Sequence, residues 1–136
     1  MSAPVELLRK VPLFAGLGDK ELKRLGDAFK EQRFPVGTVV AEEGTRTGIR
    51  LLVIAEGTAA VSVHGERVAS LGAGEAFGEI ALIDEGDRSA TVTAETELVC
   101  FGITPWVFKP LVEENPTIAW HLLQMLAARV RAAETR

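Results

Sequence analysis

The sequence has no tyrosine, one cysteine and two histidines among its 136 residues. One cysteine cannot form a disulfide within the chain, which excludes the disulfide framework of small secreted proteins. This residue, Cys100, lies in the apolar run ELVCFGI, where we expect a buried apolar side chain rather than a nucleophile. His64 and His121 are far apart in the sequence and form no close His-x-His pair, so they do not predict a metal site.

Long apolar runs and excess positive charge are also missing. No apolar run approaches the roughly 18 residues of a membrane span, and the first residues, MSAPVELLRKVPLF, lack the apolar core of a secretory signal. The 19 Asp and Glu residues outnumber the 15 Lys and Arg residues, giving a formal net charge of -4. Because binding to nucleic-acid phosphates needs a basic surface, we expect no direct nucleic-acid binding. We expect a cytoplasmic protein with no membrane segment in this chain.

The composition is that of one globular domain, since hydrophobic residues make up 47% and charged residues 25% of the chain. We divide it into an N-terminal helical segment (1–33), a β region (34–104) and two closing helices (105–136). Asp19 is the expected N-cap of a helix in the first segment. In the last segment Pro105 is expected to open one helix and Pro116 a second, longer one.

The middle region changes character, because short runs rich in Val, Thr and Ile alternate with glycine-containing turns. These turn signals recur roughly every 8–12 residues, which is typical of an antiparallel sandwich or barrel. HGER (64–67) predicts a tight hairpin and GTRTG (44–48) a looser polar loop. FGEIALI (77–83) interrupts the strands and predicts a turn that enters one short helix.

The stretch FGEIALIDEGDRSATV (77–92) combines a glycine, a carboxylate and a guanidinium among small residues. Gly78 would let the backbone approach a ligand, and the planar fork of Arg88 can clamp two anionic oxygens. Glu79 would repel a phosphate unless it accepted a hydrogen bond from a neighbouring hydroxyl, so the combination suggests a nucleotide. On spacing alone, an ordinary surface ion pair worth about 0–1 kcal/mol is an equal alternative.

This stretch resembles the phosphate-binding cassette of the cyclic nucleotide-binding domain family, whose pattern is F-G-E, an aliphatic residue, A-L, a variable loop, and then R, a small residue and A. The likeness extends over most of the chain: LLRKVPLFAGL resembles the family's N-terminal helices and LLVIAEGTAAVSV its glycine-punctuated strands. The resemblance implies an α+β fold, an antiparallel β-roll or jelly roll of about eight strands. It also implies N-terminal helices, a short cassette helix and two C-terminal helices around the roll.

Roles for individual residues follow from the resemblance. Glu79 would accept a hydrogen bond from the ribose 2′-hydroxyl. The phosphate would be held by Arg88, Ser89, Ala90, Gly78, Ile80 and Ala81. The base would contact Val61, Ala69, Leu71, Ser89 and Arg129. The strand IRLLVI carries aliphatic residues where relatives often have aromatic ones, so we expect no aromatic stack on the base from this strand.

The resemblance implies a non-catalytic sensor whose ligand is cyclic AMP or cyclic GMP, with no other cofactor. Ser89 stands where a threonine favours cyclic GMP in some relatives, so we expect cyclic AMP. Ligand binding would move the last helix, which could meet a second copy or an effector protein. A regulatory fragment of a larger channel or transcription factor is an alternative, and so is a small metal-dependent jelly-roll enzyme of the cupin type.

Overall fold

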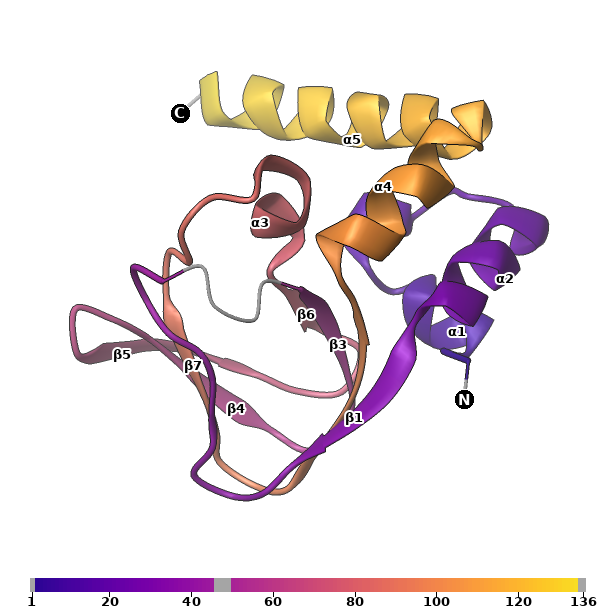
Figure 1. Cartoon of the computed structure of the whole chain (residues 1–136). Coiled ribbons are helices and arrows are strands. Elements are labelled where there is room, and N and C mark those ends of the chain that lie inside the picture. Colours follow the sequence, from indigo (N-terminus) through magenta and orange to yellow (C-terminus); the bar gives the residue numbers. More distant parts are fainter. Residues whose placement is uncertain (1, 46–49, 135–136) are drawn as a thin grey trace.

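The computed structural model describes residues 2–45 and 50–134, with Ile80 described only through its backbone (Figure 1). The eight strands are β1 (Lys30–Phe34), β2 (Val39–Ala41), β3 (Leu51–Glu56), β4 (Ala59–Val63), β5 (Glu66–Leu71), β6 (Ala76–Phe77), β7 (Thr91–Ala94) and β8 (Leu98–Ile103). The helices are α1 (Val5–Leu8), the 3-10 turn η1 (Pro12–Phe14), α2 (Asp19–Ala28), α3 (Glu79–Asp84), α4 (Pro105–Glu113) and α5 (Pro116–Glu134).

The strands form two four-stranded sheets, in the orders β1-β8-β3-β6 and β2-β7-β4-β5. Every strand pair is antiparallel, which confirms the β-roll expected from the sequence. Between the sheets lies an apolar cluster that includes Leu52, Ile54, Leu98 and Cys100. Cys100 is fully buried and free, as its apolar surroundings predicted.

A second apolar cluster lies between the helices and the outer face of the β3–β8 sheet. Leu13 and Phe14 of η1 are fully buried in it, and the ring of Phe14 meets the ring of Phe29 edge to face. Ile118 and Leu122 of α5 join the same cluster, so one face of α5 rests on the body of the domain. Figure 1 shows α5 running across α4 and the cassette helix α3.

The N-terminal segment differs from the sequence prediction at two points. Asp19 is the first residue of α2, and the N-cap is Gly18, with no side-chain cap. The helical segment also ends before residue 33, because Lys30–Phe34 is strand β1 and pairs with β8. The polar run KEQRF has no strand pattern of its own; pairing along the fully buried β8 decides its conformation.

The turns around the site follow the sequence more closely. The hairpin between β4 and β5 turns at His64 and Gly65, whose φ angles of 52° and 81° are those of a two-residue primed turn. Pro105 and Pro116 begin α4 and α5 as expected. The polar loop predicted at 44–48 falls largely on residues 46–49, outside the described part of the chain. Among the described residues, no helix has both the length and the apolar character needed to cross a membrane.

Candidate functional site

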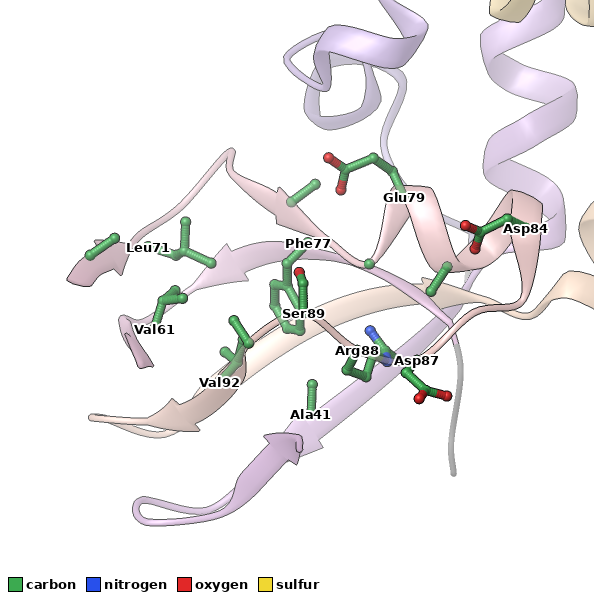
Figure 2. A pocket seen from close by; sticks show the side chains of 15 residues that line it. Ala41, Val61, Leu71, Phe77, Glu79, Asp84, Asp87, Arg88, Ser89 and Val92 are labelled. Carbon is green, nitrogen blue, oxygen red and sulfur yellow. The ribbon is translucent and has the colours of Figure 1, made fainter. Parts of the chain in front are cut away.

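One cavity opens between the cassette helix α3 and the strands β4, β5 and β7. Its volume is about 600 Å³, which lies within the range of small-molecule sites. The cavity has two chemically different ends (Figure 2). We call the end formed by Gly78, Glu79 and Arg88 the cassette end, and the end formed by Val61, Ala69 and Leu71 the strand end.

Gly78 lets the chain pass close to Arg88. It has a φ of 92°, in the left-handed region, and forms the N-cap of α3. A Cβ atom here would lie 2.6 Å from Nη1 of Arg88 and would also overlap the backbone carbonyl of Arg50. Only glycine therefore fits. The N–H groups of the helix's first turn lack partners within the helix, and this turn lines the cavity.

Arg88 is the buried cation of the cassette end, with only 6% of its surface exposed. Its Nη2 donates to the carbonyl of Arg50 at 3.2 Å, and its backbone N–H donates to the carbonyl of Thr45 at 2.9 Å. The carbonyl of Arg88 accepts from Gly44 at 2.8 Å, so neighbouring backbone fixes the residue on both sides. Burial lowers the pKa of the Arg88 guanidinium below its usual value, and the positive charge of Arg50 lowers it further. A desolvated cation beside a cavity favours an anionic ligand.

Glu79 is the first residue of α3 and links the cavity to α5. Its Oε1 accepts a hydrogen bond from Nη1 of Arg129 at 3.3 Å. The Glu79 side chain is 25% exposed and the Arg129 side chain 36% exposed, so the pair is partly shielded from water. The expected ribose-binding carboxylate therefore contacts the last helix directly.

The strand end is apolar and more open. Val61 and Leu71 are half-buried, and Ala69 is exposed on β5. Figure 2 shows Val61 and Leu71 grouped together, away from Asp84, Asp87 and Arg88 at the opposite end. The cavity thus has the Arg88 guanidinium together with the carboxylates of Glu79, Asp84 and Asp87 at one end and an apolar wall at the other.

The cavity brings together the residues that the sequence singled out, apart from two. Gly78, Glu79, Ala81, Arg88, Ser89, Ala90, Val61, Ala69 and Leu71 all line it. Ile80 lies in the first turn of α3, and its side chain is outside the described atoms. Arg129 pairs with Glu79 and is not among the residues that line the cavity, so its contact with the base stays a prediction. The sequence could not predict the Arg129–Glu79 contact, because helical periodicity indicates which residues share a face of α5 but not how far that face lies from α3.

Several lining residues were missed. Ala41, Ala76, Phe77, Asp84, Asp87 and Val92 also border the cavity. Phe77 and Asp87 adjoin the motif residues Gly78 and Arg88, which was a usable signal. Ala41 lies on β2, whose pairing with β7 brings it to the site. A contact between strands so far apart in the sequence cannot be predicted from local residue patterns.

The cavity is lined by the carboxylates of Glu79, Asp84 and Asp87 but by neither histidine. Within residues 2–45 and 50–134, no three His, Cys, Asp or Glu side chains gather in a way that could hold a metal ion. His64 lies at the β4–β5 turn beside Glu43, and His121 lies on α5 near Gly16. Neither histidine lines the cavity.

Residues 31–115 match the sequence model of the cyclic nucleotide-binding domain. The chain belongs to the cyclic nucleotide-binding domain family. It is 37% identical over 114 residues to a cyclic nucleotide-gated potassium channel of Rhizobium etli, an alignment that covers 84% of this chain and 32% of the channel. It is 31% identical to the cyclic AMP receptor protein of Thermus thermophilus, covering 90% of this chain and 59% of that protein.

Solved structures agree with the family assignment. The N-terminal domain of a transcriptional regulator from Streptomyces coelicolor superposes with a TM-score of 0.87 at 32% identity, covering 93% of this chain and 94% of that one. Thermus thermophilus catabolite activator protein gives a TM-score of 0.75 at 31% identity, with 91% and 60% covered. The chain thus spans about a third of the channel and under two thirds of the receptor protein, and corresponds to the cyclic nucleotide-binding regulatory domain of such proteins.

Proposed function

We propose that this chain is a sensor that binds cyclic AMP in preference to cyclic GMP. In this proposal the cyclic phosphate lies at Arg88, the ribose at Glu79, and the base against the strand end. The observation that carries it is the buried Arg88 guanidinium beside a cavity of about 600 Å³ whose far end is apolar.

The cavity matches the three chemical parts of a cyclic nucleotide. A phosphate monoanion complements the desolvated guanidinium, and the planar fork of Arg88 suits its two exocyclic oxygens. Glu79 can exchange its hydrogen bond from Arg129 for one from a ribose hydroxyl. An apolar wall suits the flat faces of a purine. Each part of the ligand thus has a counterpart, and none of these contacts requires a bond to be broken.

The preference for cyclic AMP rests on Ser89. This residue lines the cavity where some relatives carry a threonine that favours cyclic GMP. The relatives' names include both ligands, since a Yarrowia lipolytica cAMP-dependent protein kinase regulatory subunit and a Toxoplasma gondii cGMP-dependent protein kinase both match. Serine at this position also occurs in relatives that respond to cyclic AMP, and the proposed preference rests on that resemblance.

We further propose that the ligand's effect reaches α5 through Arg129. A ribose hydroxyl on Glu79 competes for the carboxylate oxygen that now accepts from Arg129 at 3.3 Å. Loss of this ion pair frees the outer part of α5 to shift toward the base. A ligand can bias the helix only to the extent that it binds the two positions with different affinities.

The partner of α5 stays a prediction. Trp120, Leu123 and Val130 are 64%, 57% and 57% exposed, on a different side of the helix from the buried Ile118 and Leu122. A second copy or an effector protein was expected at this helix. The cytoplasm remains the expected setting.

Calorimetric titration of the purified protein with cyclic AMP and, separately, cyclic GMP tests the proposal, with Arg88→Ala as the matched variant. We expect micromolar or tighter binding of cyclic AMP, weaker binding of cyclic GMP, and a loss of about 30-fold to several thousand-fold in Arg88→Ala. An absence of heat with both nucleotides, together with unchanged thermal unfolding, would reject the sensor. Equal affinities for cyclic AMP and cyclic GMP would reject the preference for cyclic AMP but not the sensor proposal.

A further inference from the structure

Glu43 lies on the short segment that follows β2, residues 42–45, which we call the β2 arm. The backbone N–H of Glu43 donates to Oγ1 of Thr91 at 3.0 Å. The next residue, Gly44, donates its N–H to the carbonyl of Arg88 at 2.8 Å. The β2 arm is therefore bound to the segment that supplies the cation of the cassette end.

The side chain of Glu43 contacts a different element, the turn between β4 and β5. Its Oε1 accepts a hydrogen bond from the backbone N–H of His64 at 2.9 Å, and its Oε2 lies 3.3 Å from Nδ1 of the same residue. His64 follows the last paired residues of the hairpin, Val63 and Glu66, so the strand ladder does not use this N–H. The Glu43 side chain is 26% exposed and the imidazole 88% exposed. The hydrogen bond to the backbone is therefore the stronger contact, and the exposed ion pair adds little.

The hairpin held by Glu43 carries the whole strand end of the cavity. β5 is the edge strand of its sheet and is paired with β4, and all its residues but the last are exposed. Within β5, Arg67 and Ser70 contact Glu95, whereas the turn itself is held by Glu43. The place of the strand end relative to the cassette end therefore depends on the pairing of β4 with β7 and on the Glu43 contact.

We propose that Glu43 is a positioning residue: by tying the β4–β5 turn to the β2 arm, it fixes the distance between the strand end and the cassette end. A ligand that touches both ends needs this tie, whereas a ligand that touches only the cassette end does not. Glu43 does not line the cavity, so it acts through the hairpin and not as a fourth carboxylate beside Glu79, Asp84 and Asp87. The inference rests on the proposed function for the identity of the ligand.

The test compares Glu43→Ala with Glu42→Ala. Glu42 is the preceding residue, its side chain is exposed, and its loss changes the net charge equally, while its backbone carbonyl still accepts from Thr45. We expect the Kd for cyclic AMP to rise about 5-fold in Glu43→Ala and to stay unchanged in Glu42→Ala. Glu43→Gln should recover most of the affinity, because its amide oxygen can still accept from the N–H of His64.

A ligand without a base separates positioning from general damage to the site. Ribose 3′,5′-cyclic phosphate keeps the sugar and the singly charged phosphate of cyclic AMP, and it reaches only the cassette end. Its affinity, measured by competition with cyclic AMP, should be the same in the wild type, Glu43→Ala and Glu42→Ala. Equal losses for both ligands in Glu43→Ala, or a cyclic AMP affinity equal to that of Glu42→Ala, would overturn the proposal.

Amide hydrogen exchange without ligand keeps this inference distinct from the sensor proposal. If the wild type bound neither cyclic nucleotide, the sensor proposal would fail, and hydrogen exchange would decide about Glu43. Exchange about 5-fold faster across the β4–β5 hairpin in Glu43→Ala, with an unchanged rate at the Arg88 amide, would support the tie. Hairpin exchange equal to that of Glu42→Ala would overturn it.

Discussion

The cassette end of the cavity is held by backbone contacts, whereas the strand end is formed by half-exposed side chains. Arg88 is fixed by hydrogen bonds to the carbonyls of Arg50 and Thr45 and by a glycine that no other residue can replace. In contrast, β5 is exposed along nearly all its length and supplies only Ala69 and Leu71 to the site. The cassette end should therefore determine affinity strongly, and the strand end only weakly.

Among substitutions that do not remove the Arg88 charge, the largest effect is expected when the geometry of this cation changes. In Arg88→Lys a point charge replaces a planar fork, so the side chain cannot hold two phosphate oxygens and the Arg50 carbonyl together. We expect cyclic AMP affinity to fall about 100-fold, measured by calorimetry. Arg67→Lys on the exposed strand β5 is the control, since Arg67 forms an ion pair with Glu95 near the surface and does not line the cavity. A loss below 5-fold in Arg88→Lys would show that charge alone suffices.

Gly78→Ala should give the next largest effect, and the chain offers a matched control. Gly78 and Gly65 have similar positive φ values, 92° and 81°, but a Cβ atom meets nothing within 4 Å at Gly65. Gly65→Ala should therefore cost only the left-handed penalty of about 1–2 kcal/mol in unfolding free energy. Gly78→Ala should cost about 2–3 kcal/mol and weaken nucleotide binding as well. Equal costs and unchanged binding would show that the backbone does not need to approach Arg88.

Glu79→Gln should weaken cyclic AMP binding about 5- to 10-fold, because a neutral amide accepts a weaker hydrogen bond than a carboxylate. Glu66→Gln, on exposed β5, makes the same change of charge away from the cavity. Titration of the wild type and Glu79→Gln with 2′-deoxy cyclic AMP completes a thermodynamic cycle between the carboxylate and the 2′-hydroxyl. If Glu79 binds the 2′-hydroxyl, the substitution should cost little more once that hydroxyl is absent. If the affinity losses from the substitution and from the missing hydroxyl were additive, Glu79 would not bind the 2′-hydroxyl.

The difference between the cassette end and the strand end also determines how much of the site could be predicted from the sequence. The cassette is one continuous stretch, so Gly78, Glu79 and Arg88 could be identified from residue types and order alone. Turn signals and strand composition predicted an antiparallel sandwich or barrel, and the resemblance to the family specified the β-roll. Contacts between distant segments could not be predicted. Examples are the contribution of Ala41 on β2 to the cavity, the Arg129–Glu79 pair, and the effect of the Arg50 charge on the pKa of Arg88. The strand β1 was missed for the same reason, since only its pairing with β8 makes the polar run KEQRF extended.

The smallest effect is expected at the strand end. Leu71→Ala removes apolar surface that a bound purine would cover, worth about 1 kcal/mol or roughly 5-fold in cyclic AMP affinity. Val68→Ala on the same strand is the control, because Val68 is 59% exposed and does not line the cavity. Leu71 should contribute nothing to thermal stabilisation by inorganic phosphate, which has no base. A loss at Leu71 as large as that of Arg88→Lys would mean that the strand end anchors the ligand, and the assignment of affinity to the cassette would be wrong.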